Sequence, residues 1–307
     1  MRTLPSRRAR LLLPAALITA LALSGCAPTA QTEPAADAST HPVTHARGTS
    51  EVPTNPARVV TLEPVELDTA VALGVTPVGA AVASNVAGIP AYLGVEGVTP
   101  VGTVPEPDLE AIAALKPDLI LGTESRHAKL YDQLNAIAPT VFMQTQADPW
   151  QQNVRLIGEA LGKEAQTQEL LDAFTARCDE IKQAHPVSGK TANMIRPRDE
   201  TTLSLYGPTS FAGSALECVG LTIPPQDWQD GLQADISPEN VLSARADYVF
   251  VTTTKPGDAS TLPAAIASNA SAFPSLTLVD TSYWVSGVGP KGGSLVLDDI
   301  ERVLAAK

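Results

Sequence analysis

One short sequence pattern occurs twice, far apart in the chain. Residues 108–121 read DLEAIAALKPDLIL, and residues 237–250 read SPENVLSARADYVF. When the two are aligned, Glu110 corresponds to Glu239 and Asp118 to Asp247, and a hydrophobic run follows each aspartate. The apolar positions between the two acids fit a helix, and the run after the aspartate fits a buried strand. The pattern therefore predicts one helix–strand unit in each of two similar halves.

Short β-rich segments alternate with helical segments on both sides of one long helical region. Before it, we predict strands at 58–62, 75–83, 118–122 and 140–144, and helices at 65–74, 109–117 and 128–139. After it, we predict strands at 191–196, 247–253 and 276–280, and helices at 210–220, 238–246 and 292–304. The long region contains few helix breakers. This alternation predicts two α/β lobes with mostly parallel sheets, residues 57–148 and 187–307, joined by a helical segment, residues 149–186.

The first 25 residues resemble an export signal. Four arginines precede an apolar run at 11–23, which is shorter than the ~20 residues that a membrane-spanning helix needs. The run ends in LSGC, which resembles the lipobox of bacterial lipoproteins, where Cys26 would carry the lipid. Residues 26–56 are rich in Ala, Pro, Thr and Ser, so we predict a flexible tether with solvated His41 and His45. We therefore expect an exported lipoprotein on the outer face of the cytoplasmic membrane.

The chain is acidic, with a net charge of −12 at pH 7. Removal of residues 1–25 takes away four arginines and no acid, so the mature protein carries −16. Nucleic acid needs a basic footprint, so this charge argues against nucleic acid and against binding to anionic lipid surfaces. Besides Cys26, the chain has Cys178 and Cys218. Export permits a disulfide between them, but two separately buried thiols fit the sequence equally well.

From residue 56 to its end, the chain resembles the iron–siderophore and cobalamin substrate-binding lipoproteins of ABC importers. The resemblance rests on the order and spacing of the segments PARVVTLEPVELDTAVALGVTPVG, VGTVPEPDLEAIAALKPDLILG, LNAIAPTVF, SFAGSALECVGLTIPP and ISPENVLSARADYVFV. It implies a class III periplasmic-binding-protein-like fold: two Rossmann-like lobes joined by a single long rigid helix, with the ligand cleft between them. It also implies a ferric siderophore as ligand, an ABC transporter permease as partner, and a monomer that is not an enzyme.

The two glutamates of the repeated pattern gain a role from this resemblance. In that family, a glutamate on each lobe docks onto arginines of the permease, and these match Glu110 and Glu239. Two carboxylates in equivalent places suit bidentate bonds to arginines of a two-fold permease. The alternative is that each acid only stabilises the N-terminus of its own helix through the helix dipole.

Three arginines are candidates for ligand contact. Open α/β sheets bind ligands at the carboxyl ends of their strands, and Arg126 follows such a strand. Arg196 and Arg198 end the first strand of the second lobe. If that strand continues through Pro197, both side chains point to the same side and suit an anionic or oxygen-rich chelate. The alternative for these two is a surface pair with an acid at 199–200.

Aromatic side chains supply the other ligand candidates. Tyr283 and Trp284 follow the strand at 276–280, where the family often has a ligand-contacting aromatic. Trp228 lies in another loop that we expect to face the cleft, Tyr206 lies near Arg198 in sequence, and Tyr92 lies in a loop of the first lobe. Each would bury apolar parts of a ligand and offer a polar tip, although packing in the core is almost as good an explanation for any one of them.

Other activities find less support in the sequence. GVGPKGG at 287–293 matches a dinucleotide-binding motif, but it lies in the last unit of the chain, so we interpret it as a flexible cleft loop. No G-x-S-x-G elbow is present, and four histidines are too few for a buried metal cluster, so we predict no cofactor and no direct metal ligands. His127 could contact ligand or be an exposed loop residue. Cobalamin or haem is the main alternative cargo, and an envelope scaffold is the non-transport alternative.

Overall fold

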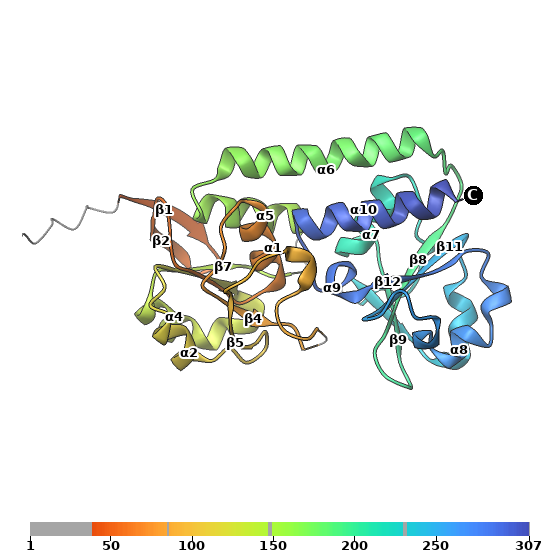
Figure 1. The fold of residues 1–307 in the computed structure, drawn as a ribbon, viewed down its shortest axis with the longest axis horizontal. Helices are drawn as coiled ribbons and strands as arrows, with labels where there is room; N and C mark the ends of the chain where they lie inside the picture. Colours follow the sequence, from red (N-terminus) through yellow and green to blue (C-terminus); the bar gives the residue numbers. More distant parts are fainter. Residues whose placement is uncertain (1–38, 85, 147–148, 230–231, 307) are drawn as a thin grey trace, which may run out of the picture. The chain divides into compact units, whose positions relative to one another are not determined.

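The computed structural model describes residues 39–306, apart from residues 85, 147–148 and 230–231. The predicted signal peptide, Cys26 and the first part of the predicted tether lie outside these residues. In the described part of the chain, no helix combines the length and apolar character that a membrane crossing requires. Figure 1 shows two α/β lobes. Each lobe is built around its own five-stranded sheet.

The first lobe contains a parallel sheet with the strand order β5-β4-β3-β6-β7. Its strands are β3 (Val59–Thr61), β4 (Gly79–Val82), β5 (Thr99–Thr103), β6 (Leu119–Thr123) and β7 (Thr140–Met143). The connections contain α1 (Pro64–Ala72), η1 (Ala91–Leu93), α2 (Leu109–Ala114), α3 (Glu124–His127), η2 (Ala128–Leu130) and α4 (Tyr131–Ile137). Helices cover parallel sheets on both faces, so β3 and β6 are buried along their whole length, as their largely apolar sequences predict.

Residues 40–53 form an antiparallel hairpin, so the prediction of a flexible tether over 26–56 is wrong for this part. Strands β1 (Thr40–His45) and β2 (Gly48–Pro53) pair in register, and Val43 and Val52 are completely buried. A two-stranded hairpin is marginal on its own in water. Its stability here depends on the rest of the lobe, which composition alone does not reveal.

The hairpin is fixed to strand β7 by hydrogen bonds. The N–H of Ala46 donates to the Phe142 carbonyl at 3.0 Å, and the N–H of Phe142 donates to His45 Nδ1 at 3.2 Å. His41 Nε2 lies 2.8 Å from the Glu159 carbonyl oxygen. Both histidines therefore have structural partners, and the prediction that they are merely solvated is wrong.

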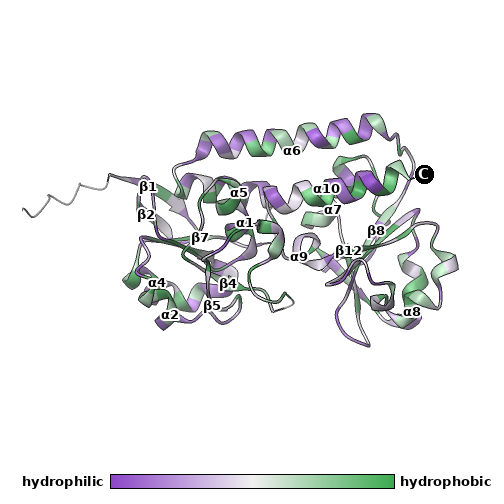
Figure 2. Cartoon of the chain, in the orientation of Figure 1, coloured by the Kyte–Doolittle hydropathy of each residue, from purple (hydrophilic) through white to green (hydrophobic). Residues whose placement is uncertain are grey.

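The chain passes from the first sheet to the second through two consecutive helices. These are α5 (Trp150–Ala160) and α6 (Glu164–Ala184), so the long helical region is interrupted once, where Gly162 adopts a φ of +64° that favours glycine. Helix α6 has 21 residues, about 30 Å at the usual rise. It runs alongside α10 (Figure 1), and hydrophilic and hydrophobic residues alternate around it (Figure 2).

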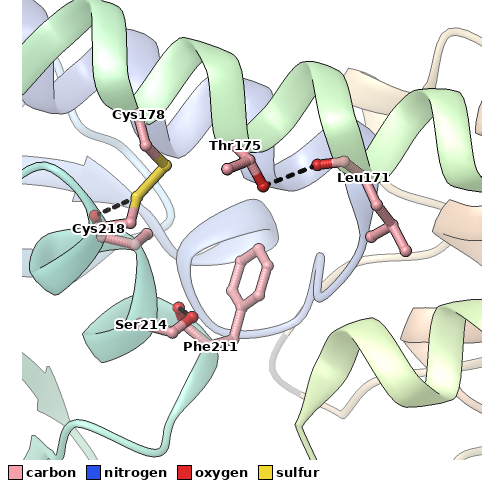
Figure 3. The surroundings of a disulfide bond; sticks show 7 residues. Leu171, Thr175, Cys178, Phe211, Ser214 and Cys218 are labelled. Carbon is pink, nitrogen blue, oxygen red and sulfur yellow. Dashed lines mark hydrogen bonds between the residues drawn. A yellow bond between two sulfur atoms is a disulfide. The ribbon is translucent and has the colours of Figure 1, made fainter.

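Cys178 and Cys218 form a disulfide, with their Cα atoms 5.5 Å apart. Figure 3 shows that the bridge joins α6 to α7 (Phe211–Cys218), close to the buried face of α6. The sequence left open either a disulfide or two separately buried thiols, and the structure contains the disulfide.

The second lobe contains a mixed sheet with the strand order β10-β9-β8-β11-β12. Its strands are β8 (Ala192–Pro197), β9 (Leu203–Tyr206), β10 (Gln233–Ile236), β11 (Tyr248–Thr253) and β12 (Leu276–Asp280). Strands β8, β11 and β12 are parallel, as predicted, whereas β9 and β10 are antiparallel additions that were not predicted. Both have only four residues, and their pairing with β8 and with each other decides their conformation.

The helices of this lobe are α7, η3 (Pro238–Ala244), η4 (Ala259–Thr261), α8 (Ala264–Ala267), η5 (Ala270–Ala272), α9 (Thr281–Trp284) and α10 (Pro290–Ala305). They include two of the three predicted ones, α7 and α10, and four short ones that were not predicted, η4, α8, η5 and α9. The segment predicted as an α-helix at 238–246 is the 3-10 helix η3.

The two copies of the repeated pattern occupy equivalent places in the two lobes. The Asp118 carboxylate accepts the N–H groups of Ala57 at 2.8 Å and Arg58 at 2.9 Å, just before β3. The Asp247 carboxylate accepts the N–H of Thr191 at 2.9 Å, just before β8. Each aspartate therefore fixes the start of its own strand to the start of the neighbouring strand, which explains why the pattern recurs.

A buried carboxylate of the first lobe connects the two lobes. Asp68 of α1 accepts the N–H of Lys291 at 2.9 Å and the N–H of Gly292 at 2.8 Å, both in the first turn of α10. The Tyr92 hydroxyl donates to the same carboxylate at 2.8 Å. We call these groups, Asp68, Tyr92 and the two N–H donors, the Asp68 junction.

The glycines of GVGPKGG make room for this junction. Val288 of the motif lines the cavity between the lobes, so the motif's predicted place at the cleft is confirmed, but residues 290–293 are the start of α10 and not a flexible loop. A side chain at Gly289 would overlap the Asp68 carboxylate, and a Cβ at Gly287 would lie 2.5 Å from the Tyr92 hydroxyl oxygen. The N-terminus of a helix attracts anions. Here the protein's own carboxylate occupies that place at α10.

One apolar cluster extends through both lobes and the helices between them. It includes Leu119 from the first sheet and Phe250 from the second. Near its middle, Trp150 of α5 packs edge-on against Phe174 and Phe211, at centroid distances of 5.0 and 5.4 Å. The lobes therefore share a continuous core in addition to the covalent connection.

Candidate ligand-binding cleft

A cavity of about 370 Å³ lies between the two lobes. From the first lobe it is lined by residues that follow each of the five strands: Glu63, Ala83, Val104, Arg126 and Gln146. The second lobe contributes the ends of β8 and β9 and the residues after β12. Small-molecule sites commonly have volumes of this order, and parallel sheets place them at the carboxyl ends of their strands. The cavity is thus where the sequence predicts the cleft.

The three predicted arginines line this cavity from both lobes. Strand β8 extends through Pro197, which is the condition for Arg196 and Arg198 to lie on the same side. Arg196 Nη1 donates to the Tyr206 hydroxyl at 3.1 Å. Within the described residues, neither Arg196 nor Arg198 forms an ion pair with an acid at 199–200, so the alternative of a surface pair does not occur.

The predicted aromatic residues separate into two groups. Tyr206 and Trp284 line the cavity, although Trp284 is only 1% exposed, stacks on Phe250 and donates its indole N–H to Asp299 at 2.9 Å. Tyr283 and Trp228 do not line the cavity.

The local structure explains why these two side chains lie elsewhere. After β12 the chain turns at once into α9, which directs the Tyr283 hydroxyl to Asp299 at 2.9 Å and its ring toward Tyr92. Trp228 packs against the apolar cluster on the outer side of the second sheet. Tyr283 and Trp228 are therefore not among the residues that we expect to contact a ligand in this cavity.

Glu63 also lines the cavity, although it was not among the residues predicted from the sequence. Its side chain is 2% exposed, and its Oε1 lies 3.1 Å from Arg126 Nε. Gln146 completes a ring, because its amide nitrogen donates to Glu63 while its amide oxygen accepts from Arg126. Burial raises the pKa of Glu63 to about 7, against the opposing effect of Arg126. Its position directly after a strand is the same signal that identified Arg126.

His127 is completely buried and has a structural role. Its Nδ1 accepts the N–H of Thr123 at 3.2 Å, so Nε2 carries the proton that is donated to the Val104 carbonyl at 2.7 Å. Burial lowers the pKa of this imidazole, which favours the neutral form. His127 neither lines the cavity nor lies exposed in a loop, so both roles predicted for it are wrong. In the described part of the chain, no group of three or more His, Cys, Asp or Glu residues is arranged to hold a metal ion.

Glu110 and Glu239 lie in equivalent, exposed places. Glu110 is in the first turn of α2, whose N-terminus is capped by Asp108 through the N–H groups of Glu110 and Ala111 at 3.0 Å. Glu239 is in the first turn of η3, where backbone and Ser237 hydrogen bonds lower its pKa. This placement fits permease docking and also fits stabilisation of a helix N-terminus.

Comparison with known sequences identifies similar proteins over most of the chain. The sequence profile of the family described as periplasmic binding protein matches residues 59–273. The probable siderophore-binding lipoprotein YfiY of Bacillus subtilis is 33% identical over 93% of this chain and 94% of its own length. The Fe(3+) dicitrate-binding periplasmic protein FecB of Escherichia coli is 33% identical over 58% of this chain and 60% of its own length.

Solved structures share the fold. Staphylococcus aureus SirA, complexed with staphyloferrin B, matches with a TM-score of 0.72 and 28% identity, covering 87% of this chain and 99% of SirA. FhuD from Vibrio cholerae, with Fe3+-Desferal bound, matches with a TM-score of 0.66 and 26% identity, covering 81% of this chain and 98% of FhuD. The likeness therefore covers most of the described residues and both lobes.

Proposed function

This chain belongs to the periplasmic binding protein family, and from that premise we propose that it captures a ferric siderophore outside the cytoplasm and delivers it to an ABC importer. The observation that carries the proposal is the cavity in which Arg126, Arg196 and Arg198 converge from two lobes. Ferric chelates present negatively polarised oxygens around the metal, and guanidinium groups donate several N–H bonds to such oxygens. The role is binding, not catalysis.

The names of the relatives support iron chelates as the ligand class. They refer to ferric dicitrate, to staphyloferrin B and to Fe3+-Desferal. In this proposal Tyr206 and Trp284 contact the ligand beside the arginines, since both line the cavity.

Delivery and location complete the proposal. Glu110 and Glu239 contact arginines of the permease, one from each lobe. Cys26 carries a lipid that anchors the exported, monomeric protein to the outer face of the cytoplasmic membrane. Support comes from the LSGC sequence at 23–26 and from relatives named as lipoproteins.

A fluorescence titration of the chain from residue 27 onward tests the ligand class. Trp150 and Trp284 line the cavity, so a bound chelate should quench their emission. Ferric citrate, a ferric catecholate, a ferric hydroxamate, haem and cobalamin are added separately. We expect saturable quenching by at least one ferric chelate, and Arg196→Ala and Arg198→Ala should each weaken it by about tenfold or more, because a charge-assisted hydrogen bond is lost.

The matched control is Arg155→Ala, which removes an exposed arginine on α5 and should leave the affinity unchanged. Quenching by haem or cobalamin alone would keep the family assignment and overturn the siderophore. The absence of any response to the five ligands would overturn the proposal as a whole.

A further inference from the structure

One of the three cavity arginines already has a carboxylate partner within the protein. Glu63 Oε1 lies 3.1 Å from Arg126 Nε, and both side chains line the cavity. The Arg126 side chain is 43% exposed, whereas that of Glu63 is 2% exposed. The guanidinium therefore has room to turn toward a ligand, while the carboxylate is fixed.

Local structure explains why Glu63 is fixed. It is the N-cap residue of α1, and its side chain accepts the N–H of Glu66 while the Glu66 side chain accepts the N–H of Glu63. This reciprocal arrangement is a capping box. Gln146 donates a further hydrogen bond to Glu63 from the segment after β7. Glu63 can thus release Arg126 without losing its own position.

The charges around Glu63 come from several elements. On its own helix, Glu66 is buried, and burial together with the neighbouring Glu63 raises its pKa well above the ordinary range. Asp68, also on α1, belongs to the junction. On α3, burial lowers the pKa of His127, and across the cavity β8 contributes Arg196 and Arg198. Gln146 and Thr123 are the neutral polar neighbours of Glu63, and Tyr206 is hydrogen-bonded to Arg196.

The protonation of Glu63 therefore decides the charge of the cavity lining. Three guanidinium groups and one carboxyl group line it, so the net charge is two positive with Glu63 ionised and three positive with Glu63 protonated. Burial raises the pKa of Glu63 to about 7, so both states are accessible near neutral pH. An anionic ligand that takes Arg126 away from Glu63 leaves a buried carboxylate without its partner, which favours proton uptake.

We propose that Glu63 is a specificity-determining residue: it is the internal counter-ion of Arg126, which an anionic ferric chelate displaces, and it takes up a proton from solvent as the chelate binds. The inference rests on the proposed capture of a ferric chelate and adds its charge class, net negative. The iron ligands and the oxidation state do not change in this step.

Calorimetric titrations of the full mature chain at about pH 6 and about pH 8 test the inference. The probes are the anionic ferric citrate and ferric catecholate complexes and a neutral ferric trihydroxamate. Glu63→Gln keeps the shape and one acceptor oxygen, and it should bind an anionic chelate about tenfold more tightly than the wild type at the higher pH. At the lower pH the wild type should approach the variant, whose own affinity should change little.

Three further measurements separate this role from a structural one. Titration in two buffers of different ionisation enthalpy should detect proton uptake in the wild type and none in the variant. In the Arg126→Gln background, Glu63→Gln should have no further effect, because the competition needs Arg126. Glu96→Gln, which removes an exposed acid of the same lobe, should leave affinity and pH dependence unchanged.

The outcomes distinguish failure of this inference from failure of the proposed function. If anionic chelates bind but Glu63→Gln leaves the affinity unchanged or weakens it, Glu63 only positions Arg126 and the inference fails, while the proposed function stands. If only the neutral chelate binds, the inference fails in the same way. If no chelate binds, the proposed function itself fails. Loss of fold in Glu63→Gln would show as a lowered melting temperature, and Arg126→Gln then supplies the pH test, since it should also abolish proton uptake.

Discussion

At the scale of single residues, the repeated pattern contains two acids with different tasks. Asp118 and Asp247 accept backbone N–H groups within their own lobes, which accounts for their recurrence by structure alone. Glu110 and Glu239 are exposed and do not line the cavity. A helix N-terminus gains only about 0.3–1 kcal/mol from a nearby acid. A partner that contacts both lobes accounts better for the same acid at the same place twice.

The double variant Glu110→Ala/Glu239→Ala tests this docking role. We expect it to abolish chelate uptake by cells while leaving chelate affinity unchanged, because two carboxylate partners for permease arginines are lost and the cavity is untouched. Uptake of radiolabelled iron chelate and fluorescence titration measure the two quantities. The matched control is Glu96→Ala/Glu217→Ala, one exposed acid from each lobe. Wild-type uptake by the double variant would contradict the docking role.

At the scale of elements, the disulfide fastens the connecting helix to the second lobe. Cys178 lies on the buried face of α6 with Leu171, Phe174 and Ile181, so packing as well as the covalent bond holds the helix. Neither cysteine lines the cavity. The bridge is therefore expected to act on stability and not on ligand contact.

Removal of the bridge should lower the free energy of unfolding without loss of the fold. The bridge joins residues separated by 40 positions, and restriction of the unfolded chain by a loop of that length corresponds to about 4 kcal/mol in the chain-entropy account. Urea denaturation of Cys178→Ser/Cys218→Ser measures the loss, and wild-type protein under a reductant serves as the comparison. An unchanged unfolding midpoint, or a chelate affinity altered as strongly as stability, would contradict this expectation.

The elements that could be predicted are those whose signal is local. The apolar runs of β3, β6 and β11 and the periodic face of α6 lie in contiguous sequence, and the cavity arginines follow from their places at strand ends. The β1–β2 hairpin and strands β9 and β10 are short, and contacts made elsewhere in the chain determine them. The place of Glu63 after β3 was a local signal that was not used, but its ion pair with Arg126 and the bond from Asp68 to Lys291 join residues far apart in sequence and could not be predicted.

At the scale of the whole described molecule, the two lobes are held together in more than one way. The α5–α6 connection is covalent, a continuous apolar cluster packs around it, and the Asp68 junction adds hydrogen bonds from α1 to the start of α10. A large rotation of one lobe would have to break the junction. We therefore expect small closure on ligand binding, which scattering curves with and without ligand can check.

The Asp68 junction also makes a prediction about stability and pH. Asp68→Ala leaves the N–H groups of Lys291 and Gly292 and the Tyr92 hydroxyl without their acceptor, which should cost roughly 3 kcal/mol. Burial raises the pKa of Asp68 from 3.8 to about 6. The folded state then binds more protons than the unfolded state between about pH 6 and pH 4, so the contribution of this group to stability grows as pH falls through that window.

The stability difference between wild type and Asp68→Ala should therefore widen on acidification, by about 1.4 kcal/mol for each pH unit within the window. Subtraction of the two proteins largely cancels the titration of Glu63 and Glu66. Urea denaturation at about pH 7 and about pH 5 measures the difference, with Asp298→Ala, an exposed acid of α10, as control. Hydrogen exchange at the Lys291 and Gly292 amides should accelerate in Asp68→Ala alone. A difference that narrows toward acid, together with unchanged exchange, would mean that the lobes are held by the shared core and the α5–α6 connection without help from this carboxylate.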